Sequence, residues 1–124
     1  DPQGRLVVVD LKTGRSPVTK DDAQSHAQLG LYQLAVAAGL LGPSGDGDAE
    51  PGGGRLVYLG KPTAAGAAER EQTALGPQDV ADWRDTVRAA AASTAGPRFT
   101  ARVNAGCAHC PIRPSCPAHA PEES

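Results

Sequence analysis

The chain has 124 residues, of which 40% are hydrophobic and 21% are charged, and its formal net charge is −2. This length allows one domain with a modest core. The slightly negative net charge does not indicate a nucleic-acid-binding protein, so any contact with DNA has to come from local clusters of basic residues. The sequence contains no run of 18 apolar residues and no signal-peptide pattern in residues 1–20, which excludes a membrane partner and predicts a cytoplasmic protein.

The first predicted element is a strand within residues 5–14, RLVVVDLKTG. The apolar run 6–9 predicts burial on both faces, as in the middle of an α/β sheet. Alternation places Asp10 and Lys12 on one side, about 6.5–7 Å apart along the strand, and Leu11 on the other. Open α/β sheets bind ligands at this end of a strand. An acid beside an amine there suits metal-assisted attack on a phosphodiester, and the alternative is a strand-end ion pair.

A helix is predicted from residue 19 to about residue 38. Thr19, followed three residues later by Asp22, is a helix-start signal, and Gly39 or Gly42 is the expected stop. Gln28 and Tyr32 lie one turn apart, so we expect them to be neighbours on the flank of the buried face. Helical spacing assigns to that face Ala27, Leu31, Leu34, Ala35, Ala38 and Leu41.

The middle of the chain alternates between loop, strand and helix signals. Residues 43–54 contain five glycines and two prolines and predict a surface loop. A second strand is expected at residues 55–60, beside the first, and residues 71–75 are a candidate edge strand. Gly76-Pro77 then opens a helix that Gly96-Pro97 ends, and its expected buried stripe is Val80, Trp83, Val87 and Ala90 or Ala91. The order predicts an α/β fold with helices flanking a central sheet.

The tail, residues 98–124, is rich in proline and holds few residues to bury, so something other than a hydrophobic core must order it. Its three cysteines lie within ten residues and predict a metal centre: Cys107, Cys110 and Cys116. For zinc, His109 or His119 would complete the ligand set. A 4Fe–4S cluster usually takes four thiolates, so its fourth would lie outside this chain. The remaining alternative is three free thiols. Residues 1–97 are therefore predicted as the core, and residues 98–124 as a cysteine tail.

Three motifs in this order, VVVDLKTG, QLGLY and CAHCPIRPSC, resemble the RecB-like branch of the PD-(D/E)XK nucleases. The resemblance is greatest to the iron–sulfur nuclease domains of bacterial helicase–nucleases that process DNA ends. It implies part of a restriction-endonuclease-like core and Mg²⁺- or Mn²⁺-dependent hydrolysis of DNA in repair and recombination. It also implies an ATP-dependent helicase domain or partner subunit.

The resemblance assigns roles to residues of this chain. Asp10 would bind the metal ion together with the Leu11 carbonyl, and Lys12 would orient the attacking water. Gln28 and Tyr32 would contact Lys12 or the DNA backbone near the scissile phosphate. Three of the four ligands of a 4Fe–4S cluster would be Cys107, Cys110 and Cys116. Candidate phosphate contacts around them are Arg98, Arg102 and Arg113.

Two features of the family are absent from the sequence: the acidic residue of the first motif and an upstream cysteine. Residues 1–4, DPQG, are typical of a turn that leads directly into the first strand. We therefore expect both features to precede residue 1 in a larger domain, and we predict that the isolated chain binds Mg²⁺ poorly and does not cleave DNA. The alternatives are a catalytically inactive module that binds DNA or a partner, and a zinc-binding structural domain.

Overall fold

The computed structural model of the protein describes residues 1–41, 49–64, 66–98 and 100–119. The chain divides into two compact units, Asp1–Val87 and Arg88–Ser124. The predicted division into residues 1–97 and 98–124 stays a prediction. None of the helices in the described ranges has the length and apolar character needed to span a bilayer.

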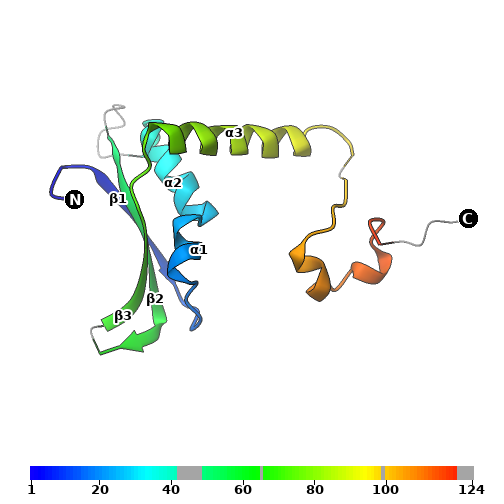
Figure 1. Ribbon diagram of the computed structural model, residues 1–124, viewed down its shortest axis with the longest axis horizontal. Helices are drawn as coiled ribbons and strands as arrows, with labels where there is room; N and C mark the ends of the chain where they lie inside the picture. Colours follow the sequence, from blue (N-terminus) through cyan, green and yellow to red (C-terminus); the bar gives the residue numbers. More distant parts are fainter. Residues whose placement is uncertain (42–48, 65, 99, 120–124) are drawn as a thin grey trace, which may run out of the picture. The chain divides into compact units, whose positions relative to one another are not determined.

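The first unit is built on a three-stranded sheet in the order β1-β2-β3 (Figure 1). Strand β1 (Leu6–Lys12) runs parallel to β2 (Pro51–Thr63), and β2 pairs antiparallel with β3 (Gly66–Gln72). The register places Asp10 beside Leu56 and Lys12 beside Tyr58. The predicted α/β class is confirmed, as is the position of the second strand next to the first.

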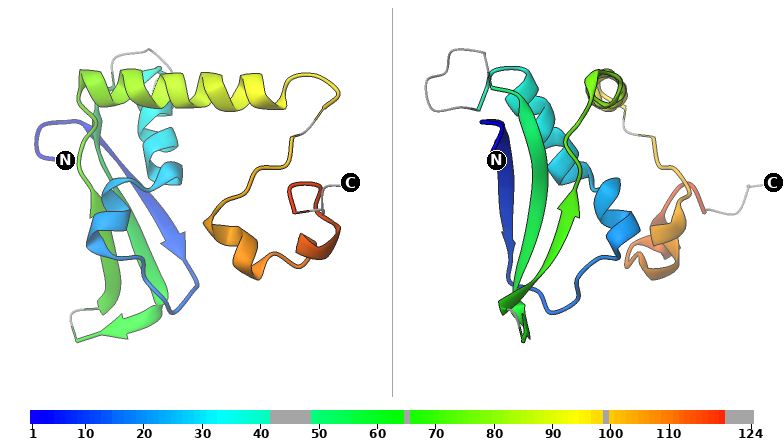
Figure 2. Two further views of the ribbon diagram at one scale, coloured as in Figure 1. Left: turned by 45° about the vertical axis from the view of Figure 1, so that its right-hand side comes forward. Right: turned by 60° about the vertical axis from the view of Figure 1, so that its left-hand side comes forward.

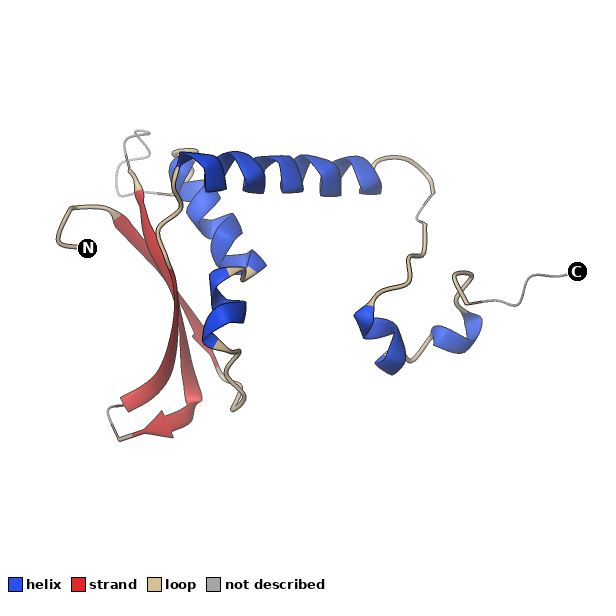
Figure 3. Ribbon diagram, viewed as in Figure 1, coloured by secondary structure: helices blue, strands red, loops and turns tan. Residues whose placement is uncertain are grey.

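Helices α1 (Lys20–Gln24) and α2 (Ala27–Ala37) cover one face of this sheet (Figure 2). Helix α1 packs against β3, whereas α2 packs against β1 and β2. Helix α3 (Pro77–Thr94) begins at the predicted proline, and the backbone N–H of Gly76 donates to Asp79 Oδ2 at 2.8 Å. In the second unit, the described residues after α3 form two short 3₁₀ helices, η1 (Ala105–His109) and η2 (Arg113–Ser115), and no strand (Figure 3).

Strand β1 is half-buried on one face and exposed on the other, so the prediction of burial on both faces is wrong. The side chains of Val7, Val9 and Leu11 lie on the face away from the helices, and Leu11 is 62% exposed. In the sheet formed by the described residues, β1 is an edge strand. A run of aliphatic residues shows that a strand suits an apolar environment, but it does not show whether another element covers each face.

The single helix predicted over residues 19–38 is two helices, interrupted at Ser25 and His26. Both predicted ends are confirmed. The Thr19 hydroxyl accepts a hydrogen bond from the backbone N–H of Asp22 at 3.0 Å, and Gly39, with φ of 69°, follows the end of α2. A non-helical pair of residues resets the rotational phase of everything after it, so the interruption matters for which side chains face the sheet.

The predicted buried stripe of α2 is wrong for most of its residues, although Leu34 and Ala35 are half-buried. Leu31 and Leu41, expected to be inward, are 42% and 44% exposed. Ala27 and Ala38 are exposed as well. The buried residues are instead Leu29, Gly30, Gln33 and Val36. Because α2 carries apolar residues nearly all the way round, their spacing could not select one buried face. The burial of the polar Gln33 depends on its hydrogen bonds, which the pattern of apolar residues does not predict.

Other boundaries also differ from the prediction. Strand β2 begins at Pro51, inside the predicted loop 43–54, of which residues 43–48 lie outside the described residues. A Cβ on Gly54 would lie 3.0 Å from Leu29 Cδ2, so glycine there lets α2 approach β2 closely. Strand β3 ends at Gln72 rather than spanning residues 71–75.

Helix α3 lacks the predicted buried stripe: none of its described residues is buried, and Val87 is 39% exposed. Trp83 is half-buried, and a Cβ on Gly30 would overlap its ring, which shows that α3 contacts α2 at this point. The core itself lies between α2 and the sheet and consists of Leu29, Leu56, Tyr58 and Ala68, with Val18 packed against it. This core lies directly beside Asp10 and Lys12 in the register of the sheet.

Candidate active site at the carboxyl end of β1

Four predicted site residues converge at the carboxyl end of β1. Asp10 and Lys12 project to the same side of the strand, and 2.7 Å separates Lys12 Nζ from Asp10 Oδ2. Gln28 of α2 joins both: Lys12 Nζ donates to its Oε1 at 2.6 Å, and its Nε2 donates to Asp10 Oδ1 at 3.3 Å. The same Nε2 donates to Tyr32 Oη at 3.0 Å. The structure therefore brings together the carboxylate, the ammonium, the amide and the phenol.

The contacts form a closed ring in which Asp10, Lys12 and Gln28 each touch the other two. The amide of Gln28 presents its oxygen to the ammonium and an N–H to the carboxylate, which is the orientation that both charges favour. An isolated ion pair at a protein surface contributes at most about 1 kcal/mol and needs no third partner. The amide bridge makes this site more than the strand-end ion pair that was the alternative.

The site is partly shielded and still reachable from solvent. The side chains of Asp10 and Lys12 are 16% and 30% exposed, and Tyr32 is 37% exposed. The Oδ2 atom of Asp10 itself is closed off from solvent and lies against the Lys12 ammonium. A ligand that carries its own charge, such as a phosphate on a polymer, can therefore approach Lys12 directly.

Two residues that the sequence did not single out hold the loop after β1. The hydroxyl of Tyr58, a side chain 5% exposed, accepts a hydrogen bond from the backbone N–H of Val18 at 3.2 Å. The Nε of Arg70 donates to the Val18 carbonyl at 2.7 Å. Tyr58 is one of only two tyrosines, which is the signal that could have drawn attention to it. Arg70 gives no signal in the sequence.

A polar hollow lies next to the loop after β1. It has a volume of about 380 Å³ and is lined by Arg15, Gly60, Lys61 and Pro62. A Cβ on Gly60 would overlap the carbonyl oxygens of Thr13 and Gly14, so glycine is required where the strand passes the loop. Arg15 and Lys61 place two positive charges at this hollow, and neither was predicted as a site residue.

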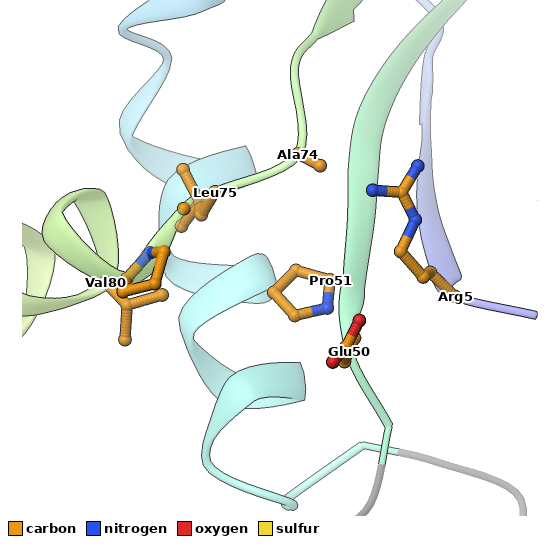
Figure 4. A pocket seen from close by; sticks show the side chains of 8 residues that line it. Arg5, Glu50, Pro51, Ala74, Leu75 and Val80 are labelled. Atoms are coloured by element: carbon orange, nitrogen blue, oxygen red, sulfur yellow. The ribbon is translucent and has the colours of Figure 1, made fainter. Parts of the chain in front are cut away.

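A larger hollow of about 500 Å³ lies at the other end of β1 and β2 (Figure 4). Arg5 and Glu50 lie on one side of it, and Leu75 and Val80 on the other. The guanidinium of Arg5 is engaged by Asp1 Oδ2 at 2.7 Å. None of the predicted site residues lines this hollow. Although it is the larger of the two hollows, we therefore do not assign it to the site at the carboxyl end of β1.

The ring offers one hard ligand to a divalent cation, the carboxylate of Asp10. In the part of the chain that the structure describes, no three His, Cys, Asp or Glu side chains are close enough together to hold one metal ion. Magnesium is commonly held by one or two carboxylates, with water and phosphate oxygens completing its shell. Asp10 therefore fits the role of one ligand in a site that substrate and water would complete.

The cysteine tail does not form the predicted ligand set. The three thiols, Cys107, Cys110 and Cys116, are free and half-buried, and they are not gathered with each other or with a histidine among the described residues. Cys107 Sγ instead accepts a hydrogen bond from the backbone N–H of Asn104 at 3.3 Å. In this arrangement the residues do not fit a shared cluster or zinc ion.

Comparison with known proteins gives one family. The model described as the PD-(D/E)XK nuclease superfamily matches residues 1–117. The matched range includes the whole ring at the carboxyl end of β1 and all three cysteines. No curated protein is significantly similar to the chain.

Proposed function

Because the chain belongs to the PD-(D/E)XK nuclease superfamily, we propose that it is part of a nuclease that hydrolyses phosphodiester bonds of DNA at the ring formed by Asp10, Lys12 and Gln28. The observation that carries the proposal is the set of contacts of 2.6–3.3 Å among these side chains at the carboxyl end of β1. The sheet flanked by helices is consistent with the restriction-endonuclease-like fold of the superfamily.

Hydrolysis needs an oriented water and positive charge where negative charge develops on the phosphate. The ammonium of Lys12 has three N–H donors. Two of them are directed at Asp10 and Gln28, which leaves the third for a water or a phosphate oxygen. Gln28 fixes the position of the ammonium, and Tyr32 in turn fixes the amide of Gln28. A divalent cation held by Asp10 and the Leu11 carbonyl would supply a Lewis acid for the phosphate.

The hollow beside the loop after β1 supports a DNA substrate. Arg15 and Lys61 are cations without an acidic residue among the other residues that line the hollow. Contacts of this kind bind the phosphate backbone regardless of sequence. In the second unit, Arg98, Arg102 and Arg113 are further proposed phosphate contacts, supported by charge alone.

We place this nuclease in an ATP-dependent helicase–nuclease that processes DNA ends in repair and recombination, as an exonuclease with a helicase domain or partner subunit. The order of the three motifs supports this finer proposal. A 4Fe–4S cluster in the tail is supported by cysteine spacing alone, and it would require Cys107, Cys110 and Cys116 to converge. Iron and acid-labile sulfide in protein purified without oxygen would support the cluster, whereas colourless protein with bound zinc would contradict it.

The direct test is Asp10→Ala in the full-length protein. We expect cleavage of linear DNA in the presence of Mg²⁺ to fall by about 10²–10³-fold or more, because the substitution removes the carboxylate that would hold the cation. Asp21→Ala is the matched control, since Asp21 is an exposed acid in the first turn of α1. Unchanged cleavage by Asp10→Ala would remove the enzymatic assignment from this site and favour a module that only binds DNA.

A further inference from the structure

Gln72, at the end of β3, is a buried polar residue that lies outside the ring. Its side chain is 3% exposed. Its Nε2 donates to the carbonyl oxygens of Ala23, Gln24 and His26 at 3.2, 3.0 and 3.2 Å. An amide nitrogen carries two hydrogens, so at least one of them is shared between two carbonyls. The carbonyls of Ala23 and Gln24 belong to the last turn of α1, and that of His26 belongs to the interruption. All three therefore lie at the junction between α1 and α2, where the helical hydrogen bonds of α1 end.

A second buried amide completes the arrangement. Gln33 of α2 is fully buried, and its Nε2 donates to Gln72 Oε1 at 2.9 Å. Its Oε1 accepts a hydrogen bond from the backbone N–H of Leu75 at 3.1 Å. Both amides are thus paired on the oxygen and on the nitrogen. Because a buried polar group without a partner is costly, such a network favours one arrangement of α2 against the end of β3 over all others.

The interruption decides which strand Gln28 faces. Gln24, the last residue of α1, lies at β3, where its Nε2 donates to the Glu71 carbonyl at 2.9 Å. Residues four apart share a face of a continuous helix, so an unbroken helix would also direct Gln28 towards β3. Gln28 instead contacts Asp10 and Lys12 on β1, on the other side of β2. Two strand spacings, about 9–10 Å, separate these alternatives.

We propose that Gln72 is a positioning residue for the ring: by holding the three carbonyls at the junction between α1 and α2, it turns Gln28 from β3 towards Asp10 and Lys12. Gln72 acts through the junction between α1 and α2, since its amide bonds to the three carbonyls there and to Gln33 rather than to any of these three side chains. The expected effect on DNA cleavage rests on the proposed function. The effect on the direction of the Gln28 side chain does not, because that direction is a property of the fold.

The test is Gln72→Met in the full-length protein, which keeps the length of the side chain and removes its donor and its acceptor. We expect kcat for DNA cleavage to fall about tenfold with KM unchanged, because Lys12 loses an accurately placed partner. In a Gln28→Ala background, the same substitution should change kcat by less than about twofold, since the residue through which it acts is already gone. An equal loss of kcat in both backgrounds would overturn the proposal.

Gln24→Met is the matched control. Gln24 also ties α1 to the end of β3, and its Oε1 accepts a hydrogen bond from the backbone N–H of Thr73 at 3.1 Å. Its side chain donates to the Glu71 carbonyl and to none of the three carbonyls that Gln72 holds. We expect a lower melting temperature with kcat within about twofold of wild type. If both methionine variants lose kcat in proportion to their loss of stability, Gln72 is structural and the proposal is wrong.

A readout without catalysis separates this inference from the proposed function. The side-chain amide resonances of Gln28, assigned by their loss in Gln28→Ala, should move in Gln72→Met towards those of a glutamine in water. Unmoved resonances would overturn the positioning role, even if Asp10→Ala had already shown that the ring does not cleave DNA. If Gln72→Met does not fold, Gln72→Asn withdraws the amide by one methylene and is expected to move the same resonances.

Discussion

In the first unit, side chains from β1 and α2, 16 and 18 residues apart, meet at hydrogen-bonding distance. In the second unit, Cys107, Cys110 and Cys116 are much closer in sequence and are not gathered into one ligand set. The difference lies in what holds each segment. The ring is carried by a strand and a helix that share a core, whereas the tail has two short 3₁₀ helices and no buried described residue. The spacing of residues in the sequence predicts where their side chains lie only where a helix or strand fixes the backbone.

Lys12→Ala gives the largest effect and tests whether the converged region is the functional one. We expect cleavage by the full-length protein to fall by about 10²–10³-fold, because the ammonium that faces the phosphate is lost. Stability should fall by no more than about 1–3 kcal/mol, since Lys12 is partly exposed but the shielded Oδ2 of Asp10 loses its partner. Lys20→Ala, at the exposed start of α1, is the control. If Lys12→Ala cleaves DNA within twofold of wild type, the ring in the first unit is not the functional region.

Truncation of apolar side chains measures how differently the two units are held together. Leu56→Ala removes a fully buried core residue and should lower the free energy of unfolding by about 2–5 kcal/mol. Ile112→Ala, at a position 68% exposed in the second unit, should change it by less than about 0.5 kcal/mol. Urea denaturation followed by circular dichroism measures both. Equal losses would show that the tail shares a core that its exposure does not reveal.

The double variant Arg15→Ala/Lys61→Ala sharpens the role of the hollow beside the loop after β1. If each cation binds one phosphate, the slope of log affinity for DNA against log salt should decrease by about two. Arg5→Ala is the control, because Arg5 lies at the other end of β1 and is paired with Asp1. Fluorescence anisotropy over a salt series makes the measurement, and an unchanged slope would exclude the hollow from the DNA contact.

The smallest predicted effect compares the two tyrosines. Tyr58→Phe removes the acceptor of the partly buried Val18 hydrogen bond and should cost about 1 kcal/mol of stability. Tyr32→Phe leaves stability within about 0.5 kcal/mol, because its hydroxyl is at a site 37% exposed, but it frees the amide of Gln28 and should lower kcat. Chemical denaturation and single-turnover cleavage distinguish them. The reverse ranking of stability would contradict the assigned roles.

The sequence by itself determined the local relations in this protein. Alternation along β1 placed Asp10 and Lys12 on one side, and helical spacing made Gln28 and Tyr32 neighbours. The cap at Thr19 and the start of α3 were predicted correctly as well. These features follow from backbone geometry over a few residues, which is why a short stretch of sequence is enough to fix them.

Only the tertiary structure decided how these local pieces face one another. The interruption before α2, the burial of Gln33 and the direction of Gln28 depend on Gln72, which donates hydrogen bonds to carbonyls 46–49 residues earlier in the chain. The exposed face of β1 depends likewise on which elements cover the sheet. A periodic pattern records the period of an element but not its rotation against distant partners, because that rotation is set by buried hydrogen bonds and packing between residues far apart in sequence.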